Sequence, residues 1–125
     1  MKLVLDAGAL IGIDRDDRRL AGFIELGRRA GAELVTTSPV VGQAWRDGGR
    51  QARLARALAM IDVRTVGLDD AKDAGELLGR TRSSDVVDAL VALLALPGDQ
   101  LLTSDVSDLA GLVEAQGGGI RLVAV

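Results

Sequence analysis

The aspartates of this sequence stand where several carboxylates could act together. Asp6 directly follows a short apolar run at the start of the chain, and Asp105 follows another such run near its end. Asp85 and Asp88 are three residues apart at the start of an otherwise apolar helical segment, which places them on one face of that helix. Carboxylate oxygens are preferred ligands of hard cations, so the pattern indicates the chemistry of a bound divalent metal.

Each of these aspartates also has a purely structural explanation. Asp6 is explained equally well by an Asx turn that ends its strand, and Asp85 by the helix dipole, which favours an acid in the first turn. Asp105 followed by Asp108 is typical of a helix cap with an acid in the first turn. Asp88 is harder to explain in this way, because a charge on a buried apolar helix is costly. Carboxylates that met in one crevice would repel one another unless a cation neutralised them, so the set is more informative than its members.

Histidine and cysteine are both absent from the 125 residues. Their absence excludes disulfides, zinc–thiolate sites, a Ser-His-Asp triad and any histidine base or metal ligand. The net charge of −3 argues against a protein that binds nucleic acid through bulk positive charge, although it does not exclude a nuclease. A GC-rich genome would also produce much aspartate, so the argument depends on positions rather than totals.

Five short apolar runs are typical of buried parallel strands. They lie at residues 2–5, 34–36, 61–66, 101–103 and 120–125. The segments between them carry apolar residues at helical spacing, at 20–30, 54–58, 71–78, 85–96 and 109–113. Strands that alternate with helices predict a three-layer α/β/α fold around a parallel sheet of about five strands. The length suits a single domain that spans residues 1–125.

The ends of two helices are marked by capping residues and proline. Ser38 followed by Pro39 predicts a helix start, with proline at the first helical position. Ser84 is expected to cap the helix that opens at Asp85, and residues 97–98, Pro-Gly, are expected to end it.

The start of the chain has no signal-peptide pattern, and no apolar run approaches the roughly 20 residues that span a bilayer. We therefore expect a cytoplasmic protein with no membrane contact.

Parallel α/β sheets place their functional crevice outside the carboxyl ends of the strands, near the point where the strand order reverses. Asp6 and Asp105 each follow a predicted strand, so both are expected at this edge of the sheet. We predict that Asp6, Asp88 and Asp105 converge there within metal-sharing distance.

Four segments in order resemble the signatures of PIN domains, and most of all those of bacterial VapC-type toxins. They are Leu5–Leu10, Ser38–Arg46, Asp88–Ala92 and Leu102–Leu109, and with their spacing the resemblance covers essentially the whole chain. It implies a Mg²⁺- or Mn²⁺-dependent endoribonuclease that acts on transfer or ribosomal RNA. It further implies a homodimer and a VapB-like antitoxin as partner.

The resemblance assigns roles to individual acids. The first acid of the family motif corresponds to Asp6, the acid on the apolar helix to Asp88, and the acid of the Thr-x-Asp segment to Asp105, with Asp85 and Asp108 as neighbours. A cation held by these carboxylates would polarise the scissile phosphate and activate a water. Hydrolysis of this kind is expected to leave a 5′-phosphate and a 3′-hydroxyl.

Gln43 departs from the family pattern, because this position normally holds a glutamate. Glutamine keeps the shape and one carbonyl oxygen, but it lacks the negative charge and cannot act as a base. Two interpretations follow: an active ribonuclease with weakened metal affinity, and a catalytically impaired PIN module that binds antitoxin or RNA without cutting.

Arginines are the candidates for holding RNA. Arg46, Arg50, Arg53 and Arg56 follow Gln43, and the last three are spaced along a predicted helix. They predict a basic ridge beside the crevice that contacts phosphates, and a solvated helix face explains them equally well.

Three further residues are each open to two interpretations. Thr103 and Ser104 are candidates for orienting a phosphate, or are simple strand-end turn residues. Trp45 is expected in the core or at an interface rather than as a platform for base stacking.

Overall fold

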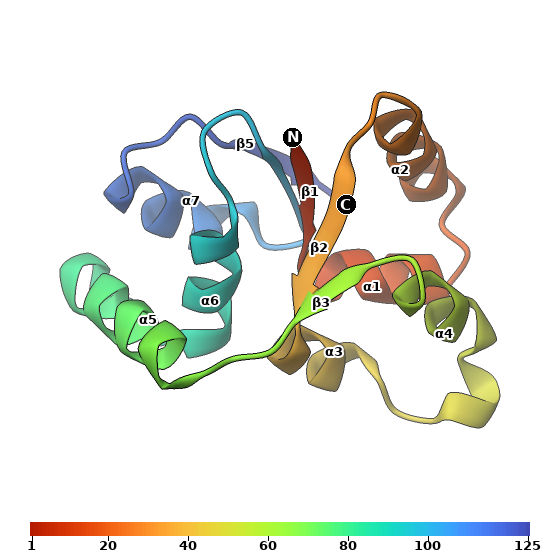
Figure 1. Ribbon diagram of the computed structural model, residues 1–125, viewed down its shortest axis with the longest axis horizontal. Coiled ribbons are helices and arrows are strands. Elements are labelled where there is room, and N and C mark those ends of the chain that lie inside the picture. Colours follow the sequence, from red (N-terminus) through yellow and green to blue (C-terminus); the bar gives the residue numbers. More distant parts are fainter.

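The computed structural model describes residues 1–125 and contains a five-stranded sheet in which every pairing is parallel (Figure 1). The strand order is β3-β2-β1-β4-β5. The strands are β1 (Lys2–Leu5), β2 (Glu33–Thr37), β3 (Asp62–Arg64), β4 (Gln100–Thr103) and β5 (Arg121–Ala124). The five predicted strands are confirmed, although β3 is shorter than the apolar run at 61–66.

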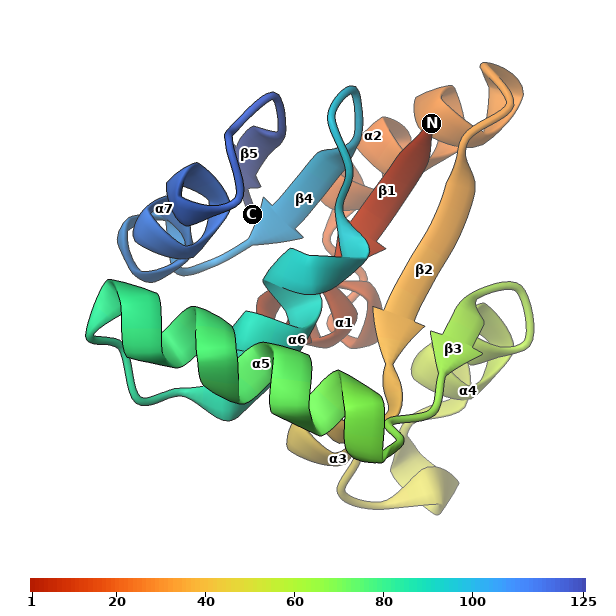
Figure 2. The same ribbon diagram turned by 60° about the vertical axis from the view of Figure 1, so that its left-hand side comes forward.

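Seven α-helices and one 3₁₀ turn connect the strands. They are α1 (Ala7–Asp14), α2 (Arg18–Arg29), α3 (Ser38–Ala44), η1 (Gly48–Arg50), α4 (Ala52–Leu58), α5 (Leu68–Thr81), α6 (Val86–Leu94) and α7 (Val106–Ala115). Helices α1, α2 and α4 cover one face of the sheet, and α5, α6 and α7 cover the other (Figures 1 and 2). The predicted three-layer α/β/α fold is thereby confirmed. No helix is long and apolar enough to cross a membrane.

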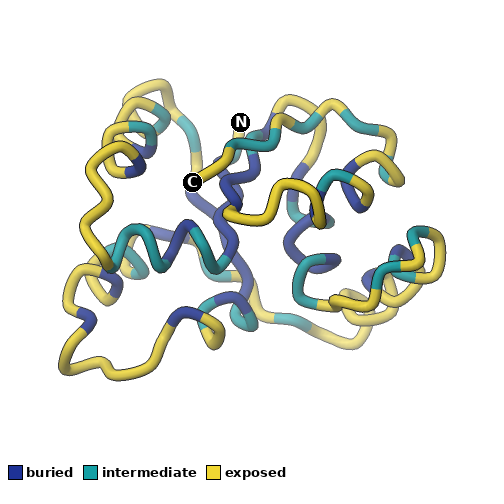
Figure 3. The backbone as a smooth tube through the Cα atoms, turned by 180° about the vertical axis from the view of Figure 1, so that it is seen from behind, coloured by how far each residue is buried: buried dark blue, intermediate teal, exposed yellow.

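The core lies on both faces of the three central strands. Leu3, Val4 and Leu5 of β1 and Leu101 and Leu102 of β4 are almost wholly buried. Because helices cover both faces, these strands are apolar at consecutive positions instead of alternating. In Figure 3 the buried backbone runs through the centre of the molecule, and the outer turns of the helices are exposed.

Two helices begin at caps that differ from the predicted ones. Thr37, not Ser38, caps α3: its backbone is extended, and its hydroxyl accepts the N–H of Val40 at 3.4 Å. Asp85, not Ser84, caps α6 by accepting the N–H of Asp88 at 3.1 Å. In both cases the N-cap is the residue whose side-chain oxygen can accept the N–H of the residue three positions later. Helix α6 ends at Leu94, before the predicted Pro-Gly stop.

Helix α1 was not predicted from the sequence. It starts immediately after β1, and its apolar residues lie all round the helix, so it lacks the periodicity that marks a surface helix. Its own residues Ala9 and Leu10 are fully buried. The helix matters for function because Asp6 stands at its N-terminus.

A buried ion pair fastens β1 to the segment that enters β4. The Asp99 carboxylate accepts the Lys2 N–H at 2.7 Å and the Leu96 N–H at 2.8 Å, and it lies 2.9 Å from the Lys2 ammonium. Burial alone would raise the pKa of Asp99, but these hydrogen bonds and the charge of Lys2 lower it below its ordinary value. The pair fixes the two central strands that lead to Asp6 and Asp105.

Candidate active site

A pocket of about 380 Å³ lies at the carboxyl ends of β1 and β4. The chain leaves β1 toward β2 on one side, whereas β4 lies on the other, so this is the point where the strand order reverses. Four aspartates from three segments of the chain line the pocket: Asp6, Asp85, Asp88 and Asp105. The other predicted residues in its lining are Gln43 on α3, Arg46 just after α3, and Ser104 in the β4–α7 loop. The structure therefore brings the main predicted residues to one place.

The carboxylates do not form a ready-made metal cage. No group of three or more acidic side chains is placed so that it could hold one metal ion, so the metal-sharing distance expected for Asp6, Asp88 and Asp105 is not found. Like charges with no opposing cation repel, and the carboxylates of Asp6 and Asp85 are engaged in helix caps. The donor set nevertheless consists of hard oxygen ligands that suit Mg²⁺ or Mn²⁺.

Asp6 is held at the end of β1 by the start of α1. It is only 7% exposed, and its Oδ1 accepts the Ala9 N–H at 3.2 Å, so it is a helix cap rather than the residue of an isolated Asx turn. Burial raises the pKa of Asp6, while hydrogen bonds from the Thr103 hydroxyl and from backbone N–H groups act in the opposite direction. The carboxylate is thus fixed in position and disfavoured as a lone charge, which a nearby cation would relieve.

Asp88 reports the crowding of negative charge most directly. Its pKa is raised to about 6, first by burial and then by repulsion from Asp85, Asp105, Asp6 and Asp108. All four predicted neighbours therefore act on the one acid for which the apolar helix offers no structural explanation. The Asp88 carboxylate has no hydrogen-bond partner of its own; only its backbone N–H is bonded, to Asp85.

Asp105 and Asp108 stand at the start of α7. Asp105 occupies the cap position without capping the helix, and its backbone N–H donates to the Thr103 hydroxyl at 2.8 Å. The pKa of Asp105 is raised by a hydrogen bond with the Asp108 carboxyl, by burial, and by repulsion from Asp108, Asp6 and Asp85. Thr103 is fully buried, so its role is to shape the loop rather than to contact a ligand.

Gly8 permits the close approach of α1 to the β4–α7 loop. A Cβ at this position would lie 2.6 Å from the Ser104 Cβ and 3.0 Å from its backbone N. Any side chain here would push Ser104 out of the pocket wall. Gly8 was not singled out from the sequence, although it lies in the Leu5–Leu10 segment, and it supports the site by leaving room for it.

Gln43 and Arg46 form the wall contributed by α3 and its end. Gln43 is exposed and lines the pocket, so it stands where the family glutamate was expected to act. The Arg46 guanidinium donates to the carbonyls of Gly42 and Trp45, at 2.9 and 2.7 Å, and makes no ion pair. Trp45 is 36% exposed, so its expected place in the core is wrong, whereas the interface alternative stays a prediction.

Gln51 holds this wall in place and was missed in the sequence. Its buried amide oxygen accepts the N–H groups of Arg46 and Asp47, at 2.7 and 2.9 Å. Its amide nitrogen donates to the carbonyl of Ala44 at 2.9 Å. Nothing in the local sequence marks this glutamine, because its role depends on how the chain folds back on itself.

The predicted basic ridge is formed only in part, since Arg53 and Arg56 share α4 but Arg50 does not. The chain breaks at Gln51 between η1 and α4, so Arg50 and Arg53 do not share a helix. Arg50 lies 3.7 Å from Asp47, and Arg53 lies 3.8 Å from Asp16, and neither lines the acidic pocket. Of the predicted RNA-binding arginines, only Arg46 is beside the acids.

A second hollow of about 550 Å³ shares the wall formed by Asp85 and Asp88. It is mostly polar, and its other lining residues include Arg82, several hydroxyl side chains and Asp108. Arg82 has a left-handed backbone with φ of 58° and makes no ion pair. No periodicity or motif marks this arginine, which the turn after α5 brings to the acids.

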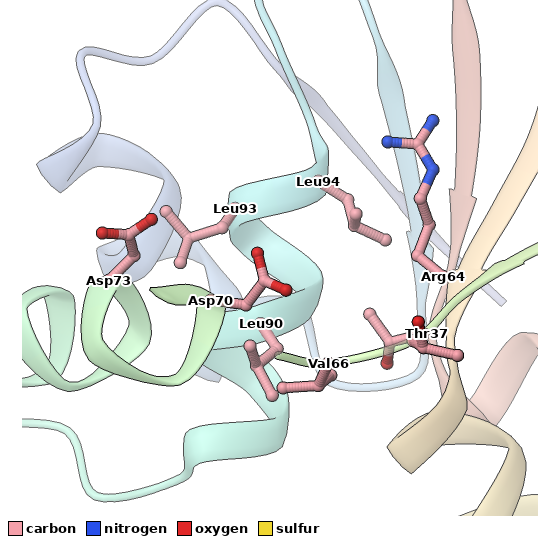
Figure 4. A pocket seen from close by; sticks show the side chains of 9 residues that line it. Thr37, Arg64, Val66, Asp70, Asp73, Leu90, Leu93 and Leu94 are labelled. Carbon is pink, nitrogen blue, oxygen red and sulfur yellow. The ribbon is translucent and has the colours of Figure 1, made fainter. Parts of the chain in front are cut away.

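A third hollow, between β3, α5 and α6, has no comparable chemistry (Figure 4). Two of its three charged groups already have partners: the Arg64 side chain lies 2.9 Å from Asp62, and the Asp70 carboxylate accepts the Gly67 N–H at 2.9 Å. Figure 4 shows leucines of α6 forming much of its remaining wall. The acidic pocket is therefore the better candidate for a reaction.

Comparison with known proteins supports the fold. The chain superposes on a chain in the crystal structure of VapBC2 from Rickettsia felis bound to a DNA fragment from their promoter, with a TM-score of 0.71 and 15% sequence identity. The match covers 100% of this chain and 99% of that one. No protein-family model and no curated protein matches the sequence.

Proposed function

We propose that this chain is a Mg²⁺- or Mn²⁺-dependent endoribonuclease and the toxin component of a VapBC-type toxin–antitoxin pair. The observation that carries the proposal is the gathering of Asp6, Asp85, Asp88 and Asp105 in one pocket at the reversal of strand order. The likeness of the fold to a chain of VapBC2 supports the assignment to this type of system.

Asp6, Asp88 and Asp105 would hold the cation, with Asp85 and Asp108 close by. The bound ion would supply polarisation of the phosphodiester and a lower pKa for an attacking water. The carboxylates would have to move closer together to share an ion, since no three of them are placed to hold one in the structure. The raised pKa values of Asp6, Asp88 and Asp105 support this assignment, because a nearby cation would stabilise each charged carboxylate.

The remaining residues of the pocket would bind and orient RNA. The exposed Arg46 guanidinium is free of carboxylate partners and can exchange its carbonyl contacts for a charge-assisted bond to a phosphate. Ser104 would offer a hydroxyl from the opposite wall, held there by the loop that Thr103 anchors. The buried Gln51 amide holds the backbone of Arg46 in place by accepting its N–H.

Mn²⁺ titration by calorimetry and cleavage of a structured RNA test the proposal together. We expect Mn²⁺ to bind and support cleavage, and we expect Asp105→Asn to reduce both at least tenfold. Glu76→Gln is the matched control, because Glu76 is an exposed residue of α5 that does not line the pocket, and the substitution removes the same charge. Tight metal binding without cleavage by the parent would refute the ribonuclease.

A catalytically impaired module is the second candidate, and Gln43 in the pocket wall is the observation that favours it. Such a module would bind a VapB-like antitoxin or RNA without cutting. Co-expression with the neighbouring open reading frame should give a stable complex in either case, so it tests the partner and not the activity. Sedimentation of the isolated chain tests the proposed homodimer, and a monomer at all concentrations would exclude it.

A further inference from the structure

Strand β5 forms an open edge of the sheet. Its neighbour on one side is β4, and no strand lies beyond it (Figure 2). The N–H of Arg121 donates to Asp99 at 3.1 Å, and that of Val125 donates to Thr103 at 3.0 Å, so both point toward β4. Backbone groups alternate in direction along a strand, and the N–H groups of Leu122 and Ala124 therefore point outward without a strand to bond.

The opposite edge of the sheet is protected, and β5 is not. Strand β3 has only three residues, two of which, Asp62 and Arg64, are charged, partly exposed and paired at 2.9 Å. Short length and charge are the usual means by which a protein prevents strands from adding to an edge. Strand β5 continues as Leu-Val-Ala-Val after its single charge at Arg121.

An apolar groove of about 410 Å³ runs along this open edge, between β5 and α2. Leu20, Phe23 and Leu26 line it from α2, while Val123 and Val125 line it from the strand and its end. Leu26 is 69% exposed and Val125 is 37% exposed. Apolar side chains beside unpaired backbone groups are the two features that a receptor for an extended peptide needs.

The charges around the groove favour an acidic ligand. Arg19 and Arg121 both line it, and neither makes an ion pair. The one carboxylate present, that of Asp17, already accepts the Leu20 N–H at 3.1 Å as the cap of α2. Two guanidinium groups are thus available for carboxylates that approach along the strand.

We propose that the α2–β5 groove binds an extended acidic segment of another protein, which adds to the sheet as a strand beside β5. Alternate apolar side chains of the segment fill the groove, and its carboxylates meet Arg19 and Arg121. A second copy of this chain is a poorer occupant, because it would bring the same arginines and a hollow rather than a ridge. The groove shares no lining residue with the acidic pocket, so the proposal is independent of the ribonuclease assignment.

Three labelled peptides test the proposal by fluorescence anisotropy with the full chain. The probe is an acetylated heptapeptide of alternating Glu and Val; one control has Lys in place of Glu, and the other has the same composition with Glu and Val in separate blocks. The alternating acidic peptide should bind at least tenfold more tightly than either control. Equal binding of all three peptides would overturn the proposal. So would a Kd of the probe weaker than 1 mM, which corresponds to about 4 kcal/mol of binding free energy.

Variants then separate the backbone from the charges. Ala124→Pro removes an outward N–H while leaving the bonds to β4, and should weaken probe binding at least tenfold; Ala124→Val keeps the N–H and should not. If the proline variant does not fold, the double variant Arg19→Glu, Arg121→Glu tests the proposal instead. Because its charges are reversed, it should bind the Lys peptide more tightly than the Glu peptide. If this double variant still preferred the acidic peptide, the proposed acidic partner would be wrong. If the chain sedimented as a dimer that Ala124→Pro dissociates, the proposal would also be wrong, because β5 would then pair with a second copy.

Discussion

Replacing Asp88 with asparagine should stabilise the metal-free protein, and the structure fixes both the sign and the size of the effect. The pKa of Asp88 rises from 3.8 to about 6 on folding, so the folded state binds a proton more tightly than the unfolded chain. Stability therefore falls as pH rises from about 4 to 6, and the loss persists above that window. Asparagine cannot ionise, so the variant avoids this loss of stability. The substitution removes no hydrogen bond, because the Asp88 carboxylate makes none.

The full shift corresponds to about 3 kcal/mol at pH 7, because one pKa unit is about 1.4 kcal/mol. Asp88 is partly exposed and solvent screens its neighbours, so we expect about 1 to 2 kcal/mol, or roughly 3–8 °C in Tm. Urea unfolding of both proteins with EDTA, at pH 8 and at pH 4, measures this difference in the free energy of unfolding. The variant should gain stability at pH 8 and none at pH 4, and Glu76→Gln should change neither.

Manganese should reverse the order of the two proteins, because only the parent retains the full ligand set. At 100 times its Kd, a ligand adds about 2.7 kcal/mol to the folded state. A loss of stability in the metal-free variant at pH 8 would refute the reasoning, since it would show that the Asp88 carboxylate supports the fold instead of straining it.

Four other outcomes are expected. Gln43→Glu should tighten Mn²⁺ binding on the order of tenfold and increase RNA cleavage, because it restores a charge to the pocket wall; equal binding and cleavage would show that this position does not limit the site. Gly8→Ala should destabilise by about 1–3 kcal/mol in urea unfolding through its contact with Ser104, and an unchanged midpoint would show that the loop yields freely. Asp99→Asn should destabilise by about 3 kcal/mol or more above pH 4, with the difference from the parent vanishing as pH falls below that value. Gln51→Leu, which leaves the N–H groups of Arg46 and Asp47 unpaired, should weaken RNA binding while Mn²⁺ affinity holds; unaltered RNA binding would remove Gln51 from the site.

The central sheet and the pocket were predictable because each depends on a simple rule. Buried parallel strands are apolar at consecutive positions, and their carboxyl ends meet at one edge, so Asp6 and Asp105 could be placed together from their positions in the sequence alone. Edge strands gave weaker signals, and β3 proved shorter than its apolar run. The helix that follows Asp6 escaped notice because it has no polar face.

The errors share a different cause. Arg50 and Arg53 appeared to lie on one helix, but the chain breaks at Gln51, whose side chain bonds back to the backbone of Ala44 and Arg46. Arg82 reaches the acids only through a left-handed turn after α5. The distances between the carboxylates depend on charge repulsion and helix capping, which the positions of these residues in the sequence do not reveal. Contacts of this kind arise from folding back of the chain and leave no periodic trace in it.

The position of Asp6 has a practical consequence for any genetic study of the protein. One carboxylate both starts α1 and faces the pocket, so an alanine here removes a helix cap, at about 1 kcal/mol, along with a charge of the site. Loss of the proposed toxicity in cells expressing such an allele would not distinguish an inactive protein from a degraded one. Asparagine caps a helix as well as aspartate does, and so Asp6→Asn is the allele whose phenotype reports on chemistry.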